Sequence, residues 1–216
     1  MRNFFLITSL LIINTLIFVS VFSSDNKNGN DSKSEEIFFS RLSRQSCDVF
    51  SITSHFTQTK YLTLINSKLV SEGTFYYQKK GKIRFDYKQP KSMSIIMMPD
   101  KLQIIAAEKK TTYDFSTQKS LADMAVVMEA CISGKIKDLP KNYVAEYRIE
   151  KDAHVIRITQ LKVSDKSPYA LIELRLNLRD YSLEQLTLFE KSDDFTTYNF
   201  SDILVNQNLK SSLFMI

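Results

Sequence analysis

Several residue types are scarce in this chain of 216 residues, and each scarcity excludes a class of protein. Two Cys are too few for a disulfide scaffold or a Cys-rich zinc module. Four Gly and four Pro exclude collagen-like and low-complexity sequence. With 44% hydrophobic and 25% charged residues, the chain has instead the composition of a globular protein that buries a core.

Motifs for catalysis are also missing. The sequence has no Gly-rich phosphate loop, no Gly-x-Ser-x-Gly elbow, no His-Glu-x-x-His and no metal-ligand cluster. Its two histidines, His55 and His154, lack nearby Cys or carboxylates at ligand spacing, so ordinary strand residues are favoured over catalytic ones. We therefore predict no enzyme activity, no catalytic residue, no metal and no cofactor.

The net charge of +5 is mild, and the basic residues are scattered between acids. Such a pattern favours a solvated surface over a binding site for nucleic acid or acidic lipid.

Residues 1–23 have the order of a secretory signal peptide. Arg2 precedes a mostly apolar stretch at 4–22, and the small Ser23 and Ser24 follow it. No Cys lies near the end of this segment to accept a lipid. We expect export to the periplasm; because the stretch is close to the length of a membrane span, a retained inner-membrane anchor is the alternative.

The polar tract at residues 24–34 has no apolar anchor and predicts a flexible lead-in. Ser34 followed by two Glu predicts the start of a short amphipathic helix that ends near Ser46. Residues 35–216 show no internal repeat and no boundary, so we expect them to form one domain.

Alternation with period two dominates this domain. The clearest case is a hairpin at residues 72–90, with an aromatic run from Phe75, a turn at Lys80-Gly81 and a stop at Pro90. One face of this hairpin is aromatic and the other is charged. Further strands are predicted at residues 50–59, 62–70, 93–98, 102–107, 111–115, 143–150, 170–178, 183–189 and 195–200.

Residues 119–133 predict a helix, capped by Gly134. Together these elements indicate an antiparallel meander that bends round, with two helices over its open side. A bent sheet too wide for its side chains to fill would enclose an apolar cavity; the alternative is a filled core with no ligand.

Four segments carry a family resemblance: Phe56-Thr57-Gln58, residues 71–75, residues 80–87 with Pro90, and Tyr198-Asn199-Phe200 with Asn206 and Phe214. In order and spacing they resemble the periplasmic outer-membrane lipoprotein carrier family, LolA. The resemblance spans roughly residues 35–214, and no single piece of it is a catalytic signature.

The resemblance implies a mainly β fold, a single curved antiparallel sheet that forms an unclosed β-barrel with a helical lid. It also implies a periplasmic chaperone that binds the acyl chains of lipoproteins released from the inner membrane and carries them to the outer membrane. The implied partners are acylated lipoproteins, an inner-membrane ABC-type release complex and an outer-membrane acceptor, and the carrier is expected to be a monomer.

Within this fold we expect two sets of site residues. The wall of the acyl-chain cavity is assigned to Phe56, Phe75, Tyr77, Phe85 and Tyr87. The lid is assigned to Leu121, Met124, Val127 and Met128.

The family resemblance also bears on three single positions, Lys79, Ile83 and Phe85. Where family members commonly carry an Arg that latches the lid, this chain has Lys79, which can donate but lacks the planar guanidinium; a solvated hairpin tip is the alternative. Ile83 lies near the position associated with hand-over to partners. Phe85 stands where the family commonly has Trp.

Cys47 and Cys131 lie at the ends of the two predicted helices. An exported protein meets oxidising conditions, so a disulfide between them is one interpretation and two buried free thiols are the other.

Two other functions are weighed against the carrier. An outer-membrane acceptor or envelope structural protein could use the same fold, but an acceptor normally carries a lipidated Cys that this chain lacks, unless the N-terminal segment tethers it. A lipid hydrolase is disfavoured because no nucleophile with a base can be named.

Overall fold

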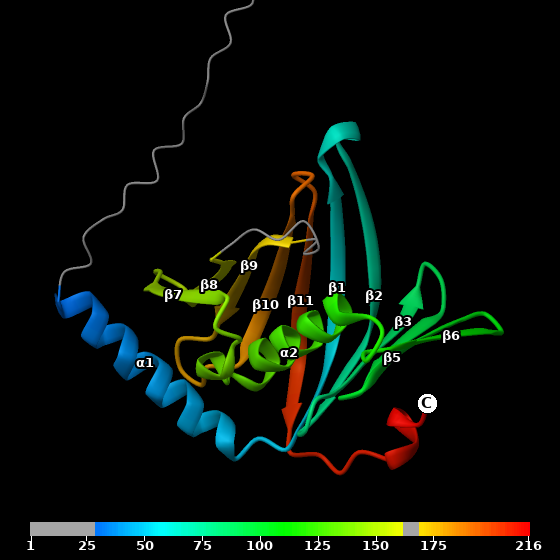
Figure 1. Ribbon diagram of the computed structural model, residues 1–216, viewed down its shortest axis with the longest axis horizontal. Coiled ribbons are helices and arrows are strands. Elements are labelled where there is room, and N and C mark those ends of the chain that lie inside the picture. The colour runs from blue at the N-terminus through cyan, green and yellow to red at the C-terminus, as the bar shows by residue number, and fades with distance from the viewer. Residues whose placement is uncertain (1–28, 162–168) are drawn as a thin grey trace, which may run out of the picture.

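The computed structural model describes residues 29–161 and 169–216 (Figure 1). The predicted signal peptide at residues 1–23 lies outside the described residues. So does part of the predicted lead-in. Helix α1 (Gly29–Cys47) begins before Ser34, so the last residues of the segment predicted as a flexible lead-in are helical.

A single antiparallel sheet of eleven strands is the framework of the described part of the chain. The strands are β1 (Ser51–Leu62), β2 (Ser67–Gln78), β3 (Lys82–Gln89), β4 (Met93–Met97), β5 (Lys101–Ala106), β6 (Lys109–Asp114), β7 (Tyr143–Ile149), β8 (His154–Gln160), β9 (Tyr169–Leu176), β10 (Leu183–Glu190) and β11 (Phe195–Val205). Their spatial order is β6-β5-β4-β3-β2-β1-β11-β10-β9-β8-β7. Because β6 and β7 are both edges, the sheet is curved but not closed, as predicted.

The first and last strands meet in the middle of this sheet, where β1 pairs with β11. Each remaining neighbour pair joins strands that are consecutive in sequence, which is the predicted meander. Two elements differ from expectation. β8 (His154–Gln160) lies outside the predicted strands. Residues 62–70 are not a separate strand: Thr63–Ile65 form a 3-10 turn, and β2 runs from Ser67 straight into the predicted aromatic hairpin.

Helix α2 (Lys119–Ser133) crosses the concave face of the sheet (Figure 1). Its bounds agree with the predicted residues 119–133, and Gly134 ends it in the left-handed conformation that glycine adopts without strain. Val127 and Met128 of α2 are buried in the main core cluster. Neither α1 nor α2, the helices of the described chain, is long and apolar enough to cross a bilayer.

Helix α1 lies over the β7 end of the sheet. Phe38 of α1 stacks on Tyr147 of β7 with ring centroids 3.8 Å apart, and Leu42 is buried in the same core. His154 stacks on Tyr181 at 4.9 Å and contacts the Tyr147 hydroxyl through Nδ1 at 3.0 Å. The amphipathic pattern of α1 therefore places its apolar face against the sheet, as the sequence predicts.

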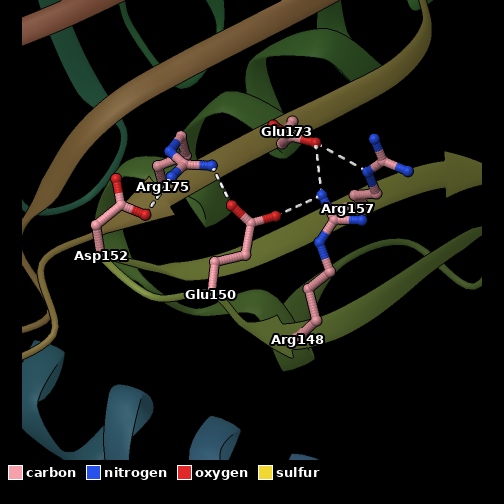
Figure 2. Close-up of polar contacts among 6 residues, drawn as sticks. All are labelled: Arg148, Glu150, Asp152, Arg157, Glu173 and Arg175. Carbon is pink, nitrogen blue, oxygen red and sulfur yellow. Dashed lines mark hydrogen bonds and ion pairs between the residues drawn. The ribbon is translucent and has the colours of Figure 1, made fainter.

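The convex face of β7–β9 carries a network of ion pairs (Figure 2). Arg175 Nη1 donates to Glu150 Oε2 at 2.7 Å, and Arg148 Nη2 lies 2.7 Å from Glu150 Oε1. Arg157 Nε donates to Glu173 Oε2 at 2.8 Å. Beneath the charges Val155 is fully buried, since the stems of neighbouring Arg side chains cover apolar surface. The network joins the edge strand β7 to its neighbours and leaves the concave face apolar.

Candidate functional site

A cavity of about 380 Å³ lies on the concave face, between the sheet and the two helices. This volume is within the range of about 300–1,000 Å³ seen for small-molecule pockets. Most of its lining is apolar. The main contributors are Leu42 of α1, Ile52 of β1, Phe75 and Tyr77 of β2, Cys131 and Ile132 of α2, Ile156 of β8, Leu174 and Leu176 of β9, Leu183 of β10, and Phe200 and Ile203 of β11.

The predicted wall residues divide into two groups. All five are buried on the concave face. The side chains predicted for the aromatic face of the hairpin therefore do share one face. Phe75 and Tyr77 line the cavity, whereas Phe56, Phe85 and Tyr87 do not. Those three rings pack on one another, with Phe56 edge-to-face against Phe85 at 5.3 Å and Tyr87 at 5.0 Å. One half of the concave face is therefore filled by aromatic rings, and the other half is hollow.

The predicted lid residues do not line the cavity. Val127 and Met128 are buried, Met124 packs against the core, and Leu121 is half-buried. The part of α2 that lines the cavity is its C-terminal end, Cys131–Ser133 with Gly134. The structure thus places α2 as a cover over the concave face; movement of that cover stays a prediction.

The rim of the cavity lies at α1, the β9–β10 loop and the end of β11. Gln45 of α1 and Asp180 are exposed at this rim, and Gln45 Nε2 donates to the Asp180 carbonyl at 2.7 Å. Val205, also at the rim, is 48% exposed. The C-terminal end of α1 therefore closes one side of the opening through a hydrogen bond.

Lys79 is the predicted latch of the lid helix α2. It does contact a helix, but that helix is α1. Its Nζ donates to the carbonyl of Cys47, the last residue of α1, at 2.8 Å. A cation at a helix C-terminus also interacts favourably with the helix dipole. The α2 neighbour of this hairpin tip is Glu129, whose carboxylate occupies the space beside Gly81. Latching of α2 by Lys79 is not part of this geometry, and a latch on α1 remains a hypothesis.

The two remaining assignments are the hand-over role of Ile83 and the disulfide between Cys47 and Cys131. Ile83 is 1% exposed and belongs to the core, so its side chain cannot touch a partner; its hand-over role stays a prediction. The disulfide is not formed, since Cys47 and Cys131 are both free. Cys47 is exposed at the end of α1 while Cys131 is buried inside the core, so the alternative of two buried thiols is wrong for Cys47.

Two polar side chains in the cavity were missed at the sequence level. Ser54 of β1 and Ser133 of α2 both line it, are buried, and have Oγ atoms without a hydrogen-bond partner in the described chain. Ser54 shares its strand face with Ile52 and Phe56, so the alternation placed it inward. Nothing in the sequence marked it as unpartnered.

The hydroxyl and thiol groups around the cavity are neutral at ordinary pH. Burial raises the pKa of the Tyr77 hydroxyl to about 12, and the nearby Glu129 carboxylate acts in the same direction. Ser133 is close enough to Tyr77 to moderate the rise, although the two oxygens do not meet the geometry of a hydrogen bond. Burial also raises the pKa of the Cys131 thiol to about 12.

No Lys, Arg or His within residues 29–161 and 169–216 lines the cavity. Among the described residues no group of His, Cys, Asp and Glu has the arrangement of a metal site. A mainly apolar space of this kind, with Asp180 at its rim, is suited to hydrocarbon. Fold and site together define a class: an open antiparallel half-barrel, covered by helices, around an apolar cavity.

Comparison with known proteins gives the family. The sequence profile of the outer membrane lipoprotein carrier protein LolA matches residues 48–216, which is more than half of the chain. The chain therefore belongs to the LolA family. No curated protein matches it in sequence.

Solved structures of similar shape have low sequence identity. A LolA superfamily protein from Nitrosomonas europaea is 10% identical, with 82% of this chain and 97% of that chain covered at a TM-score of 0.43. The lipoprotein LppX of Mycobacterium tuberculosis is 9% identical, with 82% and 98% covered at 0.42. The MucA/MucB complex of Pseudomonas aeruginosa gives 13% identity, with 85% and 61% covered at 0.41.

Proposed function

We propose that this protein is a periplasmic carrier that takes up acylated lipoproteins released from the inner membrane and passes them to the outer membrane. The observation that carries the proposal is the apolar cavity of about 380 Å³ between sheet and helices, in a member of the LolA family. Each methylene group moved from water into such a site gains about 0.8 kcal/mol. Acyl chains therefore need this shielding to cross an aqueous compartment.

The size of the cavity limits what it holds in this conformation. A methylene group is comparable in size with a water molecule, whose share of the liquid is roughly 30 Å³, so 380 Å³ accommodates on the order of a dozen methylene groups. That is about one acyl chain. A lipoprotein with several chains would require α1 or α2 to move away from the sheet, which fits their role as covers.

The test is release of a triacylated lipoprotein from inner-membrane vesicles that contain the ABC-type complex and ATP. We expect the purified protein to recover a soluble one-to-one complex. Ile203→Glu places a charge inside the cavity and should reduce recovery at least tenfold, because an unpaired buried charge is costly.

Leu204→Glu is the matched control. Leu204 is the neighbouring residue of β11, is 55% exposed, and does not line the cavity, so this variant should release lipoprotein like the wild type. Equal recovery with both variants, or no recovery with folded wild-type protein, would refute the carrier proposal.

The acceptor is a second candidate, and one observation favours it. The tip of the β1–β2 hairpin projects beyond the rest of the sheet (Figure 1) and exposes Leu64 at 96% and Ile65 at 66%. Thr63 fixes this tip, since its N–H donates to Asp194 Oδ1 at 2.9 Å and its hydroxyl donates to the Asp193 carbonyl at 2.7 Å. Apolar side chains held out in this way are suited to a lipid interface.

Binding to protein-free phospholipid vesicles separates the two candidates. An acceptor should bind the vesicles through the tip and lose binding in Leu64→Gln/Ile65→Gln. A soluble carrier should stay in the supernatant with or without these substitutions.

A further inference from the structure

Two hydroxyl groups in the cavity have no geometrically formed hydrogen bond among the described residues, although Ser133 lies near the Tyr77 hydroxyl. Ser54 is 3% exposed and Ser133 is 7% exposed, and neither Oγ has a partner among the described residues. A buried hydroxyl without a hydrogen bond is unfavourable, so such groups in a native protein call for an explanation. The two serines come from opposite walls of one cavity, Ser54 from the sheet and Ser133 from the end of α2.

Other serines of the same cavity are satisfied within the protein. Ser46 Oγ donates to the Leu42 carbonyl at 2.7 Å, and Ser182 Oγ donates to Asp180 Oδ1 at 2.7 Å. The contrast shows that serine in this environment does find partners. The free donors of Ser54 and Ser133 are therefore a property of these two positions.

We propose that Ser54 and Ser133 donate hydrogen bonds to the carbonyl oxygen of a bound acyl ester or amide. This inference rests on the proposed function and adds a polar anchor to the apolar cavity. A carbonyl oxygen has two lone pairs and can accept from both hydroxyls, whereas plain hydrocarbon leaves both donors unpaired. The anchor fixes how deep the chain lies, with its carbonyl at the hydroxyls and its methylenes among the apolar side chains.

The charges around the cavity select a neutral acyl group over a free fatty acid. In the part of the chain that the structure describes, no cationic side chain lines the cavity, and the one charged residue of this lining, Asp180 at the rim, is acidic. The C-terminal end of α2 points at the same region and carries the negative pole of the helix dipole. A carboxylate would enter without a counter-charge, so an ester or amide of a fatty acid is the favoured ligand.

The experiment compares 1-dodecanoylglycerol with 1-O-dodecylglycerol. These compounds share headgroup and chain length and differ in the ester carbonyl, and their chain matches the cavity's capacity of about a dozen methylenes. Affinities are measured by isothermal titration calorimetry with the purified protein. We expect the ester to bind about tenfold more tightly than the ether, the equivalent of one or two net hydrogen bonds.

Paired variants assign the preference to the two serines. Ser54→Ala/Ser133→Ala should still bind both compounds but reduce the ester-to-ether ratio to about one. Ser51→Ala, whose lost hydroxyl was already bonded to the Gln207 carbonyl and does not line the cavity, should keep the wild-type ratio. Ionised dodecanoate should bind the wild type more weakly than the neutral ester.

The outcomes separate this inference from the carrier proposal. If wild-type protein binds ester and ether equally, water satisfies the hydroxyls and the inference is overturned, while acyl binding stands. A preference that survives in Ser54→Ala/Ser133→Ala also overturns it. If folded protein binds neither compound, the proposed acyl cavity fails together with the inference.

Discussion

Cys131 illustrates how burial at one residue sets a pH dependence for the whole protein. Its thiol is fully buried, and its pKa rises from 9.0 to about 12. Because the unfolded chain loses this proton first, the free energy of unfolding falls as pH rises between those values, by about 1.4 kcal/mol per pH unit. Tyr77, whose pKa rises from 10.0 to about 12, adds to the loss above pH 10.

Denaturant unfolding between pH 8 and 11 measures this slope. Cys131→Ala should make the slope shallower between pH 9 and 10, whereas Cys47→Ala, at the exposed cysteine, should leave it unchanged. A slope that is identical in all three proteins would mean that the thiol is not buried as described.

Gly73 is the residue on which the filled half of the concave face depends. It lies opposite Phe56 across the β1–β2 pair, and a Cβ at this position would collide with the Asp86 carbonyl and with the Phe56 ring. We expect Gly73→Ala to lower the free energy of unfolding by about 1–3 kcal/mol, as overpacking does in other cores. The neighbouring Thr74→Ala is the control, and a Gly73→Ala protein as stable as wild type would contradict the close packing.

At the scale of elements, α1 is held by buried apolar side chains such as Phe38 and Leu42, and its C-terminal end is fastened by two polar bonds. Its C-terminal end accepts from Lys79 Nζ through the Cys47 carbonyl, and Gln45 donates to Asp180 at the cavity rim. Both contacts are exposed, so each contributes modestly and can be broken by solvent. α1 is therefore suited to open and close the rim.

Removing the Lys79 contact tests this role. Lys79→Met should raise the rate of acyl-probe uptake roughly two- to fivefold, the effect of losing one exposed hydrogen bond, and should speed amide exchange in the last turn of α1. Lys80→Met, at the adjacent turn position, should do neither. Faster exchange in α2 with no change in α1 would instead favour the lid predicted from the family pattern.

Most elements could be predicted from the sequence, but β8 was not among the predicted strands, and the ends of elements were placed less accurately. The apolar spacing of residues 119–133 and Gly134 determine α2, and the alternation around Phe75 determines the hairpin face, since both patterns are local. The pairing of β1 with β11 and the hairpin tip at Thr63–Ile65 depend on long-range register, which no local pattern encodes. The predicted strand at residues 62–70 failed for that reason.

At the scale of the molecule, the sequence identified the inward side chains but not the space between them. Phe56 and Phe85 looked equivalent to Phe75, yet only Phe75 borders the cavity. Whether an inward residue lines a hollow or fills it depends on what packs opposite, and the alternation within a strand does not encode that. Ser54 was not predicted as a site residue, because the folded structure and not the local sequence decides whether its hydroxyl finds a hydrogen-bond partner.

The central claim is that acyl chains occupy the cavity between α1, α2 and the sheet. The most direct measurement is photo-crosslinking with a dodecanoyl ester that carries a diazirine on its chain, followed by mass spectrometry of the modified peptides. The account predicts adducts on cavity-lining segments such as Phe75–Tyr77 and Leu174–Leu176, lost in Ile203→Glu. Adducts concentrated at Leu64 and Ile65, or unchanged in Ile203→Glu, would contradict it.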